Sequence, residues 1–194
     1  MAIGDLIYGQ YGLTEIDSYS STTMASEIVL DVQDASENNS LVVIMGSAQS
    51  DVNSWGLRGT YADANGTSLP VKYRQITQST TGSAGSDSST TPLITYYTAT
   101  NLNSTTYDPT SISAYVGIID FTIMLSLDRS TSAPIKRPAV FAKANNTSGS
   151  GNYYTTYTTH SLVSTTVPRK YKIWNSATGN ITANIKVYSL FART

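Results

Sequence analysis

Short runs of apolar and β-branched residues, separated by turn-forming residues, make up most of the chain. The runs at 25–32 and 41–45, for example, flank a polar connection at 34–40. Few segments repeat apolar residues at the period of a helix, and the polar filler is Ser, Thr and Asn, where helices favour Ala, Glu and Lys. The pattern therefore predicts strands and an all-β fold.

Two hairpins are predicted from pairs of such runs. The first joins 55–61 to 69–76 through the Asp-Ala-Asn-Gly turn at 63–66, a combination typical of tight turns. The second joins 170–175 to 181–192 through a glycine-containing turn. Further strands are expected at 93–99, 112–127, 139–144 and 153–166.

The run at 115–125 is the most continuously apolar in the chain, which favours a central strand covered on both faces. It contains Asp120, and a buried carboxylate must be paired or hydrogen-bonded. An Arg or backbone amides of the same chain are the simplest partners, and an ion pair at a subunit interface is the alternative. In the last strand the buried parity is expected to hold Ile181, Ala183, Ile185, Val187, Ser189 and Phe191.

About eight or nine strands with turns between them indicate an antiparallel two-sheet β-sandwich of jelly-roll type. One such domain suits a chain of 194 residues. We expect it to span 24–194. Residues 1–23 contain no Lys or Arg and mix apolar residues with glycine, so an extended N-terminal docking arm is predicted there.

Charge and cysteine content narrow the function classes. Only 13% of residues are charged, with a net charge of −1, and there is no cysteine. Nucleic-acid binding needs clustered basic residues, so no nucleic-acid partner is expected. No run approaches the about 18 to 20 apolar residues of a membrane span, and the first residues lack the charge and apolar core of a signal peptide. We therefore expect neither a membrane-spanning segment nor a signal peptide.

Motifs for chemistry are scarce. His160 is the single histidine, and a hydrogen-bonded strand residue is its simplest interpretation. Asp31, Asp34 and Glu37 have oxygen donors for calcium, but an Asx-rich turn between two strands is the simpler explanation. The prediction is a protein that is not an enzyme, with no catalytic residue, cofactor or metal. A glycosidase built on two carboxylates is a remaining alternative.

Tyrosine gives the positive indication of function, with 14 Tyr against 3 Phe and 2 Trp. Its ring combines apolar area with a hydrogen-bonding tip, which suits wet interfaces and sugar-binding platforms, although Tyr also simply favours strands. The predicted partner-binding residues are Ile3, Leu6, Ile7, Tyr8, Tyr11 and Leu13 in the arm, and Tyr96, Tyr97, Tyr153, Tyr154 and Tyr157 in strands.

The stretch Arg169-Lys170-Tyr171-Lys172-Ile173-Trp174-Asn175, followed by Gly179-Asn180-Ile181 and the final strand, resembles accessory virion proteins of tailed bacteriophages. These are capsid decoration (cement) proteins and fibre-head domains. The resemblance implies a non-enzymatic virion protein that stabilises the particle, binds capsid or tail proteins and forms a homotrimer. The alternative that it implies is a receptor- or carbohydrate-binding head of a fibre or tail.

Overall fold

The computed structural model describes residues 11–33, 41–52, 55–79, 84–87, 118–126, 139–147, 153–162, 166 and 168–192. Within these residues the chain forms strands and no helix. The strands are β1 (Tyr11–Ala25), β2 (Glu27–Asp31), β3 (Leu41–Ser50), β4 (Leu57–Ala62), β5 (Val71–Ser79), β6 (Ala84–Asp87), β7 (Ile119–Ser126), β8 (Ala139–Thr147), β9 (Tyr153–Leu162), β10 (Lys170–Asn175) and β11 (Ile181–Ala192).

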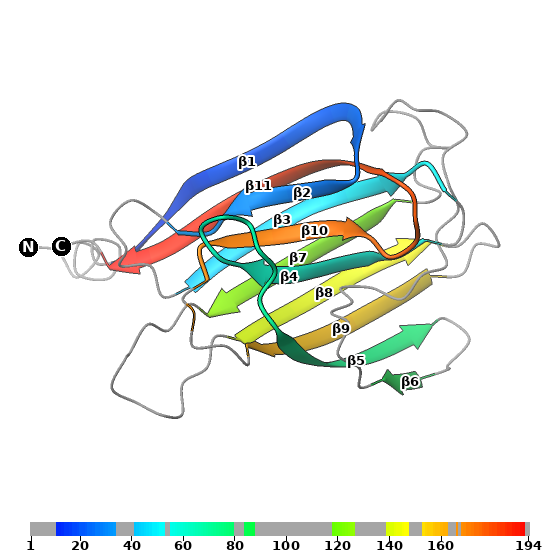
Figure 1. The fold of residues 1–194 in the computed structure, drawn as a ribbon. Coiled ribbons are helices and arrows are strands. Elements are labelled where there is room, and N and C mark those ends of the chain that lie inside the picture. The colour runs from blue at the N-terminus through cyan, green and yellow to red at the C-terminus, as the bar shows by residue number, and fades with distance from the viewer. Residues whose placement is uncertain are drawn as a thin grey trace, which may run out of the picture.

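The strands form two antiparallel sheets (Figure 1). The large sheet has eight strands in the order β1-β11-β3-β7-β8-β9-β5-β6, and the small sheet has three in the order β2-β10-β4. One hydrophobic core joins them, because Ile28 and Tyr171 of the small sheet cluster with Ile44, Ile123 and Ile185 of the large one. The predicted all-β, two-sheet antiparallel fold is thus confirmed.

Strand alternation explains how each sheet supplies this core. In β2 the burial pattern alternates strictly, and Ile28 and Leu30 are each 1% exposed. In β11 the side chains of Ile181, Ala183, Ile185, Val187 and Ser189 are all buried, which confirms the predicted parity at these positions. Each fully buried Ile, Leu or Val contributes about 1.5–3 kcal/mol relative to an exposed one.

Neither predicted hairpin forms a two-stranded ladder, because each pair of runs is divided between the two sheets. The first is paired at its tip alone, through the Ala62–Ser68 bridge and the hydrogen bond from the Leu69 amide to the Tyr61 carbonyl. Strand β4 pairs with β10 in the small sheet, whereas β5 pairs with β6 and β9 in the large one.

The predicted turn itself exists: the Asp63 carboxylate accepts hydrogen bonds from the amides of Asn65 and Thr67 at 2.8 Å, and Gly66 has a φ of 81°. The chain reverses at this turn and then passes from β4 in the small sheet to β5 in the large sheet.

The connection from β10 to β11 crosses in the same way, and it is fixed to the connection that follows β3. The Asp51 carboxylate accepts from the backbone amide of Asn180 at 2.7 Å and from its side-chain amide at 3.0 Å. The Asn175 side chain donates to the Ser50 hydroxyl, which donates to the Asn180 carbonyl at 2.8 Å. These bonds are made between residues far apart in sequence, so no local pattern predicts them.

Strand β7 is a core strand, as predicted, but it is not covered on both faces. It lies between β3 and β8, and Ile119, Phe121, Ile123 and Leu125 are buried. Asp120 and Met124 point away from the core and are exposed. The expectation of a buried Asp120 is therefore wrong. An apolar strand with one open face has nearly the same sequence pattern as a strand that is covered on both faces. Residues 112–117 and 127 of the predicted strand lie outside the described residues.

The described part of the predicted N-terminal arm is the edge strand β1. It pairs with β11 along its length, and Ile16 and Tyr19 pack against the core. The Asp17 carboxylate also accepts the backbone amide of Asp31 in β2 at 2.7 Å, which connects the edges of the two sheets. The expected border between residues 23 and 24 falls inside β1. Residues 1–10 lie outside the described residues.

Candidate functional site

The outer face of the large sheet, turned away from the small sheet, is the candidate site. Alternation along each strand places every second side chain on this face, opposite to the buried positions. Met45 of β3 is 49% exposed, Met124 of β7 is 41% exposed and Tyr157 of β9 is 36% exposed. Met45 and Met124 are diagonal neighbours on adjacent strands, so their side chains form the apolar part of this open face.

The strand register arranges the outer face in rows. One row runs through direct cross-strand partners in the order Lys186, Met45, Thr122, Lys143 and Tyr157. The next row is apolar and contains Tyr188, Val43 and Met124, and the row on the other side is polar and contains Asn184, Ser47 and Asp120. Direct partners lie about 4.5–5.5 Å apart, so each row is a continuous strip of side chains.

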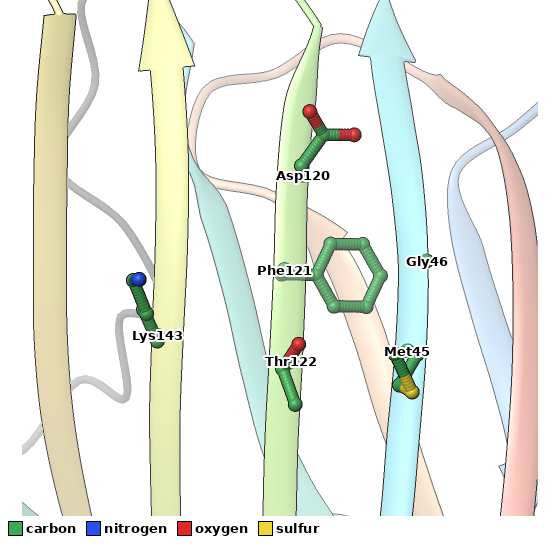
Figure 2. A pocket seen from close by; sticks show the side chains of 6 residues that line it. All are labelled: Met45, Gly46, Asp120, Phe121, Thr122 and Lys143. Atoms are coloured by element: carbon green, nitrogen blue, oxygen red, sulfur yellow. The ribbon is translucent and has the colours of Figure 1, made fainter.

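Two shallow hollows lie in the middle of the outer face. They measure about 280 Å³ and about 340 Å³, and both are lined by Met45, Gly46 and Asp120. Figure 2 shows the first of them, with Asp120, Phe121 and Thr122 on β7, Met45 and Gly46 on β3, and Lys143 on β8. The hollow is therefore built from three neighbouring strands, whose positions the sheet hydrogen bonds determine.

Gly46 is required by the close approach of β3 to β11. A Cβ atom at this position would lie 2.6 Å from the backbone oxygen of Asn184 and 3.0 Å from the Cα of Ile185. Both neighbours are backbone atoms, which cannot rotate away. Any side chain at residue 46 would push the two strands apart below the hollows.

The charges of the outer face differ in whether they are compensated. Lys186 Nζ lies 2.8 Å from Glu15 Oε2, and this hydrogen bond raises the pKa of Lys186. Lys143 Nζ lies 6.0 Å from the centre of the Tyr157 ring, a weak cation–π contact. Asp120 makes no ion pair with any residue that the structure describes. The Asp120 side chain is exposed to solvent, but its partial burial against the sheet raises its pKa.

The outer face of the small sheet has a different character. Lys172 Nζ lies 2.7 Å from Glu27 Oε2, and Lys170 Nζ lies 3.9 Å from Asp31 Oδ1. The basic residues that stand close together in the sequence at 169–172 thus include two with acidic neighbours. The exposed apolar residue on this face is Val29 of β2, at 43%.

Of the predicted contact residues, Tyr157 is placed on the outer face of the large sheet. Tyr11 and Leu13 lie in β1, and Tyr153 and Tyr154 lie in β9, as strand positions whose side chains are not described. Ile3, Leu6, Ile7, Tyr8, Tyr96 and Tyr97 lie outside the described residues. Within the predicted set, Tyr157 is thus the residue whose side chain the structure describes.

The sequence-based prediction missed Met45, Met124 and Lys143. The signal for Met124 was its parity with Asp120, since a polar residue in an apolar strand marks the open face. Met45 has no such mark, because Leu41, Val43 and Met45 are as apolar as their buried neighbours Val42 and Ile44.

Metal, catalytic and membrane features were also sought in the described part of the chain. It contains no group of three or more His, Cys, Asp or Glu side chains placed to hold a metal ion. His160 is a position of β9, in register with Tyr73 and Val140. None of the described segments forms a helix of the length and hydrophobicity that a membrane span requires.

No protein-family model, curated protein or solved structure matches the chain.

Proposed function

We propose that this chain is a non-enzymatic virion structural protein, a capsid decoration protein that stabilises the particle through protein–protein contacts. The observation that carries the proposal is the exposure of Met45, Met124 and Tyr157 together on the outer face of the large sheet. Burying apolar surface yields about 25 cal/mol per Å², and a rigid sheet loses little conformational entropy when it docks. The virion assignment itself rests on the sequence resemblance.

The finer fold assignment in this proposal is a jelly roll. Its support is the path of the chain, because β1 to β5 alternate between the large and the small sheet and β1 lies beside the last strand, β11. Jelly rolls recur in viral capsid domains.

The hollows bear on the enzymatic alternative. Among the described residues that line them, Asp120 is the single carboxylate. Glycoside cleavage by the usual route uses a pair of carboxyl groups about 5–9.5 Å apart. The outer face is accordingly proposed as a surface for contact.

A matched pair of variants tests the contact role. Met45→Glu and Val29→Glu each place a carboxylate at a similarly exposed apolar position, directly opposite a lysine, Lys186 and Lys172 respectively. Both variants should fold, because each new carboxylate stands at an exposed position on the sheet surface, where substitutions cost little stability. In co-sedimentation with virus particles, Met45→Glu should lose attachment and Val29→Glu should keep it. Equal attachment of both variants would refute the proposed surface.

The proposed docking arm needs a shorter truncation than residues 1–23. Removing 11–23 would delete most of β1 and the Asp17 link to β2, so the domain itself would lose stability. Removal of residues 1–10, which hold Ile3, Leu6, Ile7 and Tyr8, leaves β1 whole. The proposal expects loss of particle attachment with an unchanged melting temperature, and attachment at the wild-type level would refute the arm.

Tyr157 supports a second candidate function, a receptor- or carbohydrate-binding head. An aromatic ring that is 36% exposed on the outer face of the sheet offers a platform on which a sugar ring can stack. A glycan array should then show binding by the wild type and none by Tyr157→Ala. An array without a bound glycan would leave the decoration proposal as the better one.

A further inference from the structure

Two charges on the outer face lack a counter-charge within the described chain, and they are diagonal neighbours. Asp120 of β7 is in register with Asn145 of β8, and Lys143 stands two positions before Asn145. Diagonal neighbours of this kind lie about 7–8 Å apart. No ion pair joins the two side chains, and Figure 2 shows them at separate places, Asp120 on β7 and Lys143 on β8.

An adjacent positive and negative charge on one face are self-complementary under two-fold symmetry. A two-fold axis that lies in the plane of the contact, midway between the two groups, exchanges their positions. Each lysine then faces the aspartate of the other copy, and the same patch serves both partners, as in isologous dimers. Lys186 does not compete for the partner's aspartate, because Glu15 already holds it at 2.8 Å.

The apolar groups around this charge pair suit the same contact. Met45 shares the row of Lys143, with Thr122 between them, and Met124 lies on the strand of Asp120. At 49% and 41% exposed, these two methionines offer flexible apolar surface beside the charges. They contribute buried area, while the charges determine the orientation of the partner.

We propose that the outer face of the large sheet packs against the same face of a second copy of this chain, with Lys143 of each copy paired to Asp120 of the other. The inference rests on the proposed function and deepens it: the outer face joins two copies, and the dimer is the species that attaches to the particle, so Met45→Glu loses attachment because it breaks the dimer. In the dimer each Asp120 carboxylate gains a counter-charge that the described part of its own chain does not provide.

The first measurement is the mass of the wild-type protein in solution, by light scattering and sedimentation at micromolar concentration. The expected mass is twice the chain mass of 20.8 kDa. A monomer across the whole concentration range would overturn the two-fold contact. A mass of three chains, as the sequence resemblance implies, would overturn it as well.

Charge reversal then tests the geometry. Asp120→Lys creates two facing lysine pairs in the dimer, and Lys143→Asp creates two facing aspartate pairs. Each single variant should weaken dimerisation by about 100-fold or more, since two attractive contacts become repulsive. Asp31→Lys on the small sheet is the control, an equal change of charge at an exposed position, and its dimer should persist.

Mixing the two variants is the decisive step. In a heterodimer of Asp120→Lys with Lys143→Asp, both cross-contacts are again between opposite charges. An equimolar mixture should therefore restore the dimer, which a labelled copy of one variant would report by fluorescence energy transfer. If the variants are folded by circular dichroism but the mixture stays monomeric, the proposed pairing is wrong.

The same samples separate this inference from the proposed function. If the wild type is monomeric, yet Met45→Glu still loses attachment to particles, then the partner of the outer face is another virion protein and only the pairing fails. If the wild type is dimeric and binds no particle, the pairing stands and the decoration role fails.

Discussion

The outer faces of the two sheets differ in whether their charged side chains have a partner of opposite charge. On the small sheet, Lys172 and Lys170 have acidic neighbours, and the Thr60 hydroxyl donates to the carbonyl of Leu69, which helps to cover β4. On the large sheet, two methionines are more than 40% exposed and Asp120 faces no described counter-charge.

The small sheet is not without open groups, since Val29 is 43% exposed and Arg58 Nε has no hydrogen-bond partner among the described residues, but its two lysines are paired. The large sheet exposes more apolar side chains together with a carboxylate that no described residue pairs, and we therefore expect it to be the contact surface.

The largest expected effect separates the two sides of a single strand, β7. Ile123 is fully buried and Met124 is 41% exposed on the outer face. Ile123→Ala should reduce the free energy of unfolding by about 2–5 kcal/mol, because it leaves a cavity. Met124→Ala should change it by less than about 0.5 kcal/mol. Chemical denaturation of both variants checks this, and a large loss in Met124→Ala would mean that the outer face belongs to the core.

The next effect concerns the floor of the hollows. Gly46→Ala places a Cβ 2.6 Å from the Asn184 carbonyl oxygen, so β3 and β11 must separate. Overpacking of this kind costs about 1–3 kcal/mol. The melting temperature should fall, and dimerisation should weaken because the rows of the outer face lose their alignment. An unchanged melting temperature would show that the strands tolerate the shift.

A smaller effect compares lysines on the two outer faces. Lys172→Ala removes the 2.7 Å ion pair with Glu27, and such surface pairs are worth about 0.2–1 kcal/mol. Lys143→Ala removes no ion pair within the described chain, so the monomer should keep its stability. Urea titrations at low and high salt check both, because the loss in Lys172→Ala should shrink with salt. Equal losses of stability in the two variants would show that the lysines of the two outer faces do not differ in their ion pairing.

The smallest effect is a dependence on pH at Asp120. Partial burial raises its pKa in the folded state, so the ionised form is less favourable there than in the unfolded chain. This contribution to stability is complete at low pH and is lost as the pH rises through the raised pKa. Asp120→Asn should therefore be slightly more stable than the wild type at pH 7, by less than about 0.5 kcal/mol after screening by solvent.

The measurement for Asp120→Asn is thermal unfolding at the lowest workable protein concentration, where the chain is monomeric. The gain should disappear below the ordinary carboxyl pKa, where both proteins carry a neutral side chain. A gain that persists at low pH would point to a cause other than ionisation.

The sequence by itself determined the all-β class, the core parity of β11 and the turn at residues 63–66, because side-chain alternation and turn chemistry are local properties. It did not determine which sheet a strand joins: β4 and β5, like β10 and β11, are neighbours in the chain but lie in different sheets. A turn specifies that the chain reverses, while the next hydrogen-bonding partner depends on all the other strands.

The residues of the candidate site also differ in whether the sequence or the tertiary structure identified them. Tyr157 was chosen from the sequence for its chemistry, and it lies on the outer face. The setting of Met45, Met124, Lys143 and Asp120 was decided by the tertiary structure. An apolar strand has two faces of nearly equal hydrophobicity, and only the position of the small sheet leaves one of them open.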